Sequence, residues 1–290
     1  MKKQEKFFFF GFGQTAKYFI RELRGSKKKY IFFATSTKKT GIHYLDKKKI
    51  RFFKFNKEKF DKKIIEFLKQ SDYILVSIPP QNKKDIVLQK FSKYLKDFKN
   101  KKIIYLSATS VYGNHHGKWV NEKSPLKGKT KFGISRKLVE KAWLKFRKAS
   151  NVNVNILRIS GIYSKENNVI KKILKKSIYV KEKKYFSRIR IEDLVIIIKK
   201  IFFSPKKFLI LNASDDKPST NVEVARYAAK LLNLKNLKSV PISQFKNKMI
   251  KEFYKDSKKV SNRNTKRKLN LRLKYPTYKK GLIDIFNNPY

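Results

Sequence analysis

Residues 7–19 read FFFFGFGQTAKYF, and this stretch decides the fold that the sequence predicts. A short apolar strand of four phenylalanines runs into the pattern G-x-G-x-x-G/A, filled here by Gly11, Gly13 and Ala16. The first glycine of this pattern permits a tight turn, the second lets the backbone approach a pyrophosphate, and the small third residue lets the helix pack closely on the strand. The stretch therefore predicts a site for a dinucleotide.

The helix that follows the turn supplies the second half of this prediction. Gln14 and Thr15 lie where this helix is expected to begin, and the amides at a helix N-terminus attract an anion. The N-terminal lysines followed by an apolar run could also be interpreted as a secretion signal. A signal needs roughly 7–15 apolar residues and a cleavage site, whereas polar residues begin again at Gln14.

The first half of the chain alternates between apolar strands and amphipathic helices. Expected strands cover 6–10, 30–34, 50–55, 73–78, 102–106 and 152–159, and expected helices cover 15–23, 60–68, 86–98 and 135–146. Continuous apolar strands that alternate with helices indicate a parallel sheet covered on both faces. The expected fold of this part is therefore α/β, a doubly wound Rossmann sheet.

The second half is less regular. A helix at 191–203, a strand at 208–212 and a helix from 220 to about 232 are expected, the last opened by a capping box of Thr220 and Glu223. We place the NAD(P)-binding domain at residues 1–165 and a smaller C-terminal lobe at 166–290, with part of 186–215 returning to the core.

Composition restricts the class of protein. The 290 residues contain no cysteine, which excludes disulfides and thiol nucleophiles, and no stretch is apolar enough to span a membrane. We expect a cytoplasmic protein. The net charge of +53 comes from lysines spread along the whole chain, which favours compositional drift over a nucleic-acid surface. The densest basic segment, 262–274, is where such a surface would lie.

The end of the second strand bears on the choice of cofactor. An acidic residue at this position holds the 2′-hydroxyl of the adenosine ribose in NAD-binding proteins, but here the sequence reads Ala-Thr-Ser-Thr-Lys-Lys over 34–39. Thr35, Ser36 and Lys38 would suit a 2′-phosphate, so NADP is favoured over NAD. Ser77 and Pro79, at the end of the strand over 73–78, complete the expected cofactor site.

Several later motifs, taken with the glycine turn, resemble one known superfamily. They are SATSVYG at 107–113, NEKSP at 121–125, KFGISRKLVE at 131–140, LRISGIY at 157–163, FSRIRIED at 186–193 and LNASDDKP at 211–218. In this order they are similar to the short-chain dehydrogenase/reductase superfamily, in its extended branch of NAD-dependent epimerases and dehydratases. The resemblance covers nearly the whole chain. It implies a Rossmann sheet with a smaller C-terminal lobe that binds the substrate, a nucleotide-sugar-like substrate, and dimerisation through the helix over 135–146.

The resemblance also implies a catalytic trio of Ser/Thr, Tyr and Lys, and this chain departs from it at each position. The three positions hold Ala108, Phe132 and Arg136. Phenylalanine has no ionisable proton, so Phe132 cannot exchange a proton with a substrate oxygen. Arg136 keeps a positive charge and could hold the nicotinamide ribose, although a guanidinium is not equivalent to an ammonium group.

Another residue would have to supply the acid or base. The candidates are Tyr112, Tyr163, His115, His116 and Lys131, of which Tyr112 and His115 are put forward. The adjacent pair of His115 and His116 lacks the spacing of a metal site, so no metal is expected. Three functions stay open at this point. The first is an oxidoreductase or epimerase with a displaced acid, the second an inactive NAD(P)-binding sensor or partner, and the third, least favoured, a basic nucleic-acid-binding protein.

Overall fold

The computed structural model describes residues 4–99, 101–176, 178–180, 182–245 and 248–289. These residues form two compact units, each built from several segments of the chain. Unit 1 contains residues 1–107, 135–157 and 195–210, and unit 2 contains 108–134, 158–194 and 211–290. Residues 195–210 belong to unit 1 and residues 108–134 belong to unit 2. A division into two domains at residue 165 stays a prediction.

The central sheet has eight strands in the order β13-β8-β6-β5-β1-β2-β4-β3. Their bounds are β1 (Glu5–Phe10), β2 (Tyr30–Ser36), β3 (Gly41–Leu45), β4 (Lys48–Lys54), β5 (Tyr73–Val76), β6 (Lys102–Ala108), β8 (Asn153–Ile159) and β13 (Ile210–Ala213). β1 pairs in parallel with β2 on one side and with β5 on the other. The chain thus adds strands first on one side of β1 and then on the other, which confirms the predicted Rossmann topology.

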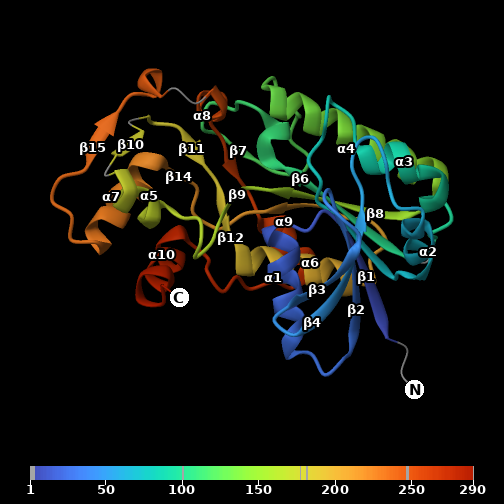
Figure 1. The fold of residues 1–290 in the computed structure, drawn as a ribbon. Coiled ribbons are helices and arrows are strands. Elements are labelled where there is room, and N and C mark those ends of the chain that lie inside the picture. Colours follow the sequence, from blue (N-terminus) through green and yellow to red (C-terminus); the bar gives the residue numbers. More distant parts are fainter. Residues whose placement is uncertain (1–3, 100, 177, 181, 246–247, 290) are drawn as a thin grey trace. The chain divides into compact units, whose positions relative to one another are not determined.

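The helices cover both faces of this sheet (Figure 1). They are α1 (Gln14–Glu22), α2 (Lys63–Gln70), α3 (Ile86–Leu95), α4 (Lys131–Ser150) and α6 (Ile191–Phe203). The phenylalanine run shows how a strand with two buried faces is built. Phe7 packs against Phe19 of α1 and Phe202 of α6, whereas Phe10, on the opposite face, packs against Phe91 of α3. All four phenylalanines are fully buried.

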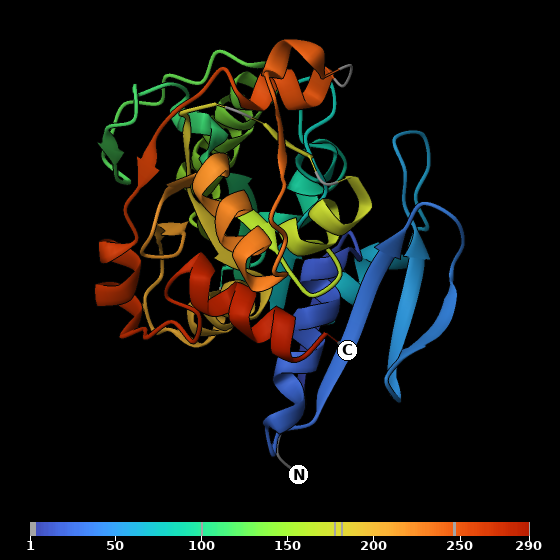
Figure 2. The same cartoon turned by 90° about the vertical axis from the view of Figure 1, so that its left-hand side faces the viewer.

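The edge strand β3 is the one strand of this sheet that the sequence analysis missed. It pairs antiparallel with β4 through a tight turn at Asp46 and Lys47, both with positive φ, and it lies at the edge of the sheet (Figure 2). A hairpin turn with two residues of positive φ usually has the sequence Asn-Gly or Asp-Gly. Here the second position carries lysine, so the turn left no recognisable signal.

Unit 2 is a collection of short strands and helices. Its strands are β7 (Trp119–Val120), β9 (Gly161–Tyr163), β10 (Ile178–Val180), β11 (Tyr185–Phe186), β12 (Arg188–Arg190), β14 (Ser219–Thr220), β15 (Lys238–Val240) and β16 (Lys259–Val260). Its helices are α5 (Val169–Lys176), α7 (Asn221–Leu231), α8 (Lys248–Phe253), α9 (Arg263–Leu269) and α10 (Tyr278–Asn287). The predicted capping box at the start of α7 is confirmed, with Thr220 and Glu223 bonded reciprocally.

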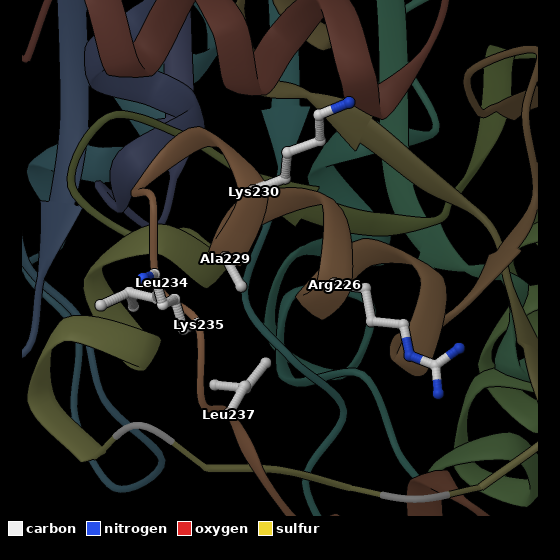
Figure 3. A pocket seen from close by; sticks show the side chains of 6 residues that line it. All are labelled: Arg226, Ala229, Lys230, Leu234, Lys235 and Leu237. Carbon is white, nitrogen blue, oxygen red and sulfur yellow. The ribbon is translucent and has the colours of Figure 1, made fainter.

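A pocket of about 360 Å³ opens in unit 2, at the end of α7 and the connection to β15 (Figure 3). Its lining residues are Arg226, Ala229, Lys230, Leu234, Lys235 and Leu237. The three cationic side chains are exposed. None is held in a buried position that would select a particular ligand, so we assign the pocket no function.

Candidate functional site

The glycine turn lies at the carboxyl end of β1, where the strand order of the sheet reverses. Gly11 has φ +90, and a Cβ on it would lie 2.7 Å from the hydroxyl of Ser77. Gly13 differs, because a Cβ on it would meet nothing within 4 Å. The turn therefore needs its first glycine for its own folding, while the second leaves open space beside the backbone. We call this turn and the start of α1 the phosphate cradle, residues 11–16.

The start of α1 fits a phosphate group. Gly13 is the N-cap, no side chain caps the first turn, and that turn contains no acidic residue. The side chain of Ala16 is buried, as close packing of helix and strand requires. Amides at a helix N-terminus, together with the helix dipole, favour an anion such as the pyrophosphate of a dinucleotide. Gln14 and Thr15 are half-buried at this end of the helix, and their part in a cofactor site stays a prediction.

The three predicted cofactor residues at the end of β2 differ from one another in burial. Thr35 is buried, and its hydroxyl accepts the N–H of Gly11 at 2.9 Å. This bond ties the end of β2 to the glycine turn. Ser36 is half-buried and Lys38 is exposed, so both side chains are open to a ligand.

Ser77 and Pro79 follow β5, on the other side of the turn. The hydroxyl of Ser77 donates to the carbonyl oxygens of Phe10, at 3.0 Å, and Gly11, at 3.2 Å. The N–H of Ser77 also donates to the Phe10 carbonyl, at 2.9 Å. The ends of β1 and β5 are thus fastened together at the reversal of strand order, where open α/β sheets bind their ligands.

Arg136 lies on α4 and is fastened to β6. Its Nη1 donates to the carbonyl of Leu106, at 2.7 Å, and to the hydroxyl of Tyr105, at 3.1 Å. Tyr105 is the register partner of Val76, the residue before Ser77. The guanidinium group therefore lies in unit 1, at the same carboxyl edge of the sheet as the phosphate cradle.

Ala108 and Phe132 belong to unit 2. Ala108 is the last residue of β6, and Phe132 lies one helical turn before Arg136 on α4, which begins at Lys131, four residues before the predicted start. The ring of Phe132 is 41% exposed and stacks on Phe253 of α8, with 6.2 Å between the ring centroids. The position that the resemblance assigns to tyrosine is thus a surface aromatic.

Tyr112 is completely buried in unit 2. Its hydroxyl donates to Oδ1 of Asn212, at 2.7 Å, and accepts from Nη1 of Arg158, at 3.1 Å. Burial raises its pKa, which opposes release of the proton. These contacts make Tyr112 part of a buried hydrogen-bond network with Asn212 and Arg158, and we propose no catalytic role for it.

His115 is the more accessible candidate. Its Nε2 lies 3.2 Å from the carbonyl oxygen of Pro125. A carbonyl can only accept, so Nε2 carries the proton, and in the neutral ring Nδ1 then has the lone pair. His115 therefore presents a nitrogen that can accept a proton.

Residues 87–190 match the model of the family described as the NAD dependent epimerase/dehydratase family. The resemblance to the epimerase/dehydratase branch is confirmed. Among curated protein sequences, none matches the chain.

Solved structures resemble the chain over nearly its whole length. A functionally unknown conserved protein from Silicibacter pomeroyi is 25% identical, with a TM-score of 0.83, and the match covers 98% of this chain and 99% of that one. dTDP-glucose 4,6-dehydratase from Bacillus anthracis, in complex with NAD, is 16% identical, with a TM-score of 0.78 and coverage of 98% and 96%. UDP-glucose 4-epimerase from Thermotoga maritima, with UDP-glucose, is 14% identical, with a TM-score of 0.75 and coverage of 97% of each chain.

Two hydrogen bonds in unit 1 fasten α4 to other parts of the unit, and the sequence analysis assigned neither of them. The hydroxyl of Ser107 donates to the buried carboxylate of Glu140, at 2.5 Å. Buried Asp85 caps α3 and accepts the indole N–H of Trp143 on α4, at 3.2 Å. A polar residue directly before the apolar run IVL is a recognisable cap. The bonds to α4 join distant parts of the chain, and no local signal predicts them.

Asp215 in unit 2 gives a pH-dependent prediction. The residue is 1% exposed, no described group bonds to its Oδ2, and burial raises its pKa to about 8, against the lowering effect of Arg188. Between about pH 4 and pH 8 the unfolded carboxyl is ionised while the folded one keeps its proton, so stability falls as pH rises through this window. We expect urea denaturation to show a smaller decline for Asp215→Asn than for the wild type. An equal decline in both would contradict this assignment.

Among the described residues, no cluster of three His, Cys, Asp or Glu side chains could hold a metal ion. No helix in the described part of the chain is long and apolar enough to cross a membrane.

Proposed function

We propose that this chain binds NAD(P) in the phosphate cradle and acts as an oxidoreductase or epimerase on a nucleotide-sugar-like substrate. One observation carries the proposal. An uncapped helix N-terminus adjoins open space at Gly13, at the reversal of strand order in the sheet. The family match and the nucleotide-sugar enzymes among the similar structures support the same class of reaction.

The cofactor that fits best is NADP. The segment 34–39 contains no carboxylate to accept from a ribose hydroxyl, and it offers the hydroxyl of Ser36 and the exposed ammonium of Lys38. A phosphate monoester is recognised by such donors and positive charges.

Arg136 would hold the nicotinamide half of the cofactor. Its guanidinium is fixed by the bonds to Leu106 and Tyr105, which leave little conformational freedom to lose on binding. A bound nicotinamide supplies or accepts the hydride. Arg136 would orient the ribose and keep a positive charge at the position of the family's lysine.

His115 would supply the acid/base function that Phe132 lacks. The bond to Pro125 fixes the tautomer and leaves Nδ1 to accept a proton. We expect His115→Gln to lower the turnover rate by about 10²–10⁴-fold, the usual contribution of general acid/base catalysis. The glutamine amide can still donate to the Pro125 carbonyl, so cofactor affinity and thermal stability should be unchanged. Unaltered turnover in this variant would remove His115 from the proposal.

Fluorescence titration with NADPH and NADH tests cofactor binding, and absorbance at 340 nm with a panel of nucleotide-sugars then tests turnover. We expect binding of both cofactors, tighter for NADPH, and turnover of at least one sugar. Binding of neither cofactor would overturn the proposal. A polyanion-binding role would appear instead as affinity for any duplex that falls steeply with salt.

Cofactor binding without turnover is the second candidate function. The observation that favours it is Phe132, an exposed ring without an ionisable proton at the family's tyrosine position. Such a protein would act as a sensor or partner that responds to the cofactor. It predicts binding with no turnover across the panel, and no effect of His115→Gln on any measured property.

A further inference from the structure

The loop that leaves β2 is fixed at both of its ends by hydroxyl groups. At its start, Oγ of Ser36 accepts the N–H of Lys38 at 3.2 Å. At its end, Oγ1 of Thr40 accepts the N–H of Lys54 at 3.0 Å and donates to Oδ2 of Asp61 at 2.8 Å. We call these two bonds of Thr40 the Thr40 latch. The bonds are made by the protein itself, without a ligand.

The latch fastens the loop to two further elements of unit 1. Lys54 is the last residue of β4, and Asp61 precedes α2. The other carboxylate oxygen of Asp61 accepts the N–H of Lys63, at 2.9 Å, and its own N–H donates to the carbonyl of Lys54, at 2.9 Å. Thr40 is thus bonded to a group that is already held at the start of a helix.

The latch also affects which charged groups are available near the ends of β2 and β4. Both oxygens of the Asp61 carboxylate accept hydrogen bonds, one from Thr40 and one from the Lys63 N–H. Lys38, Lys39 and Lys54 are exposed, and Lys54 is the register partner of Ser36. The loop between Ser36 and Thr40 therefore carries exposed cationic residues between two points that hydroxyl groups fix to the protein.

We infer that Thr40 is a positioning residue for phosphate recognition, and that its latch holds Lys38 and Lys39 where they meet the 2′-phosphate of NADPH. The inference rests on the proposed function and adds to it a residue that need not touch the cofactor. A loop ordered in advance loses less conformational freedom when a ligand binds, so the latch increases affinity for the phosphate without contacting it. A disordered loop with the same lysines would recognise the 2′-phosphate less well.

The test uses 2′,5′-ADP and 5′-AMP as probes, because they differ only in the 2′-phosphate. Their affinities are measured by displacement of NADPH fluorescence in the full chain. Thr40→Val keeps the shape of the side chain and removes both hydrogen bonds, and Thr40→Ser keeps the hydroxyl. We expect Thr40→Val to weaken binding of 2′,5′-ADP about three- to tenfold, because the two lost bonds act on the phosphate only indirectly and about the net contribution of a single intramolecular hydrogen bond reaches it. The affinity for 5′-AMP should stay unchanged, and Thr40→Ser should restore the wild-type ratio.

Three results would overturn the inference. Equal weakening of both probes would mean that the latch supports the cradle in general, and an unchanged ratio in both Thr40→Val and Thr40→Ala would mean that it supports nothing at the phosphate. Binding of neither NADPH nor NADH by the wild type would overturn the proposed function as well. Because Thr40 is exposed, thermal melting should show folded variants; Thr40→Ala provides a second substitution without the β-branch.

Discussion

Gly13→Ala should weaken NADPH binding by about ten- to a hundredfold while leaving the free energy of unfolding unchanged. A methyl group at Gly13 meets no protein atom within 4 Å, and the backbone there has φ −86, which alanine adopts readily. The added carbon would therefore occupy only the space that a pyrophosphate needs. Overpacking costs typically ~1–3 kcal/mol, which corresponds to this loss of affinity. Fluorescence titration and urea denaturation of the same variant measure the two quantities.

Gly11→Ala is the matched control, because it should lower stability as well. Its φ of +90 strains any residue with a side chain, and its methyl group would lie 2.7 Å from the Ser77 hydroxyl. Residues held in such conformations cost ~1–3 kcal/mol, before the clash is added. The double variant Gly11→Ala/Ser77→Ala should recover the part of the stability loss that is due to the clash. The part that is due to the strained φ at residue 11 should remain. If Gly13→Ala proves as destabilising as Gly11→Ala, the space beside Gly13 is not a ligand site.

The contrast between these two glycines shows what sequence can predict about the cradle. The pattern at 11–16 placed the turn, the helix and the two glycines correctly, because each requirement is local to a few residues. It could not predict that Thr35 bonds to the Gly11 N–H, since that contact joins residues 24 positions apart. Thr35 was predicted to face the cofactor, and the structure gives its hydroxyl a partner in the protein.

The altered catalytic positions mark a second limit. The resemblance assigns Phe132 to the position of the family's tyrosine, but it says nothing about the surroundings of that ring. The stacking on Phe253 depends on a helix more than 100 residues later in the sequence. Thr40 is a residue whose role in the fold no motif predicts. It belongs to no motif, and its importance arises only because β4 and the start of α2 meet at its hydroxyl.

Gly281→Ala should destabilise the fold, although glycine to alanine inside a helix normally stabilises by about 1 kcal/mol. Gly281 lies in α10, and a Cβ on it would be 2.1 Å from the hydroxyl oxygen of Tyr163 and 2.8 Å from two carbons of the ring. Both groups are held in place, because Tyr163 is buried and the carbonyl of Gly281 accepts from Nη1 of Arg190 at 3.0 Å. The clash should outweigh the gain in helix propensity and cost ~1–3 kcal/mol in net stability by urea denaturation.

Tyr163→Phe separates this clash from a general effect on α10. The Tyr163 hydroxyl is buried and has no hydrogen-bond partner among the described residues, so its removal alone should leave stability equal or slightly higher. In the double variant the closest contact disappears while the 2.8 Å contacts to the ring persist, so part of the loss should be recovered. The two substitutions should therefore be non-additive by about 0.5–3 kcal/mol, as expected for residues in contact. Strict additivity would show that α10 does not pack on Tyr163 through Gly281.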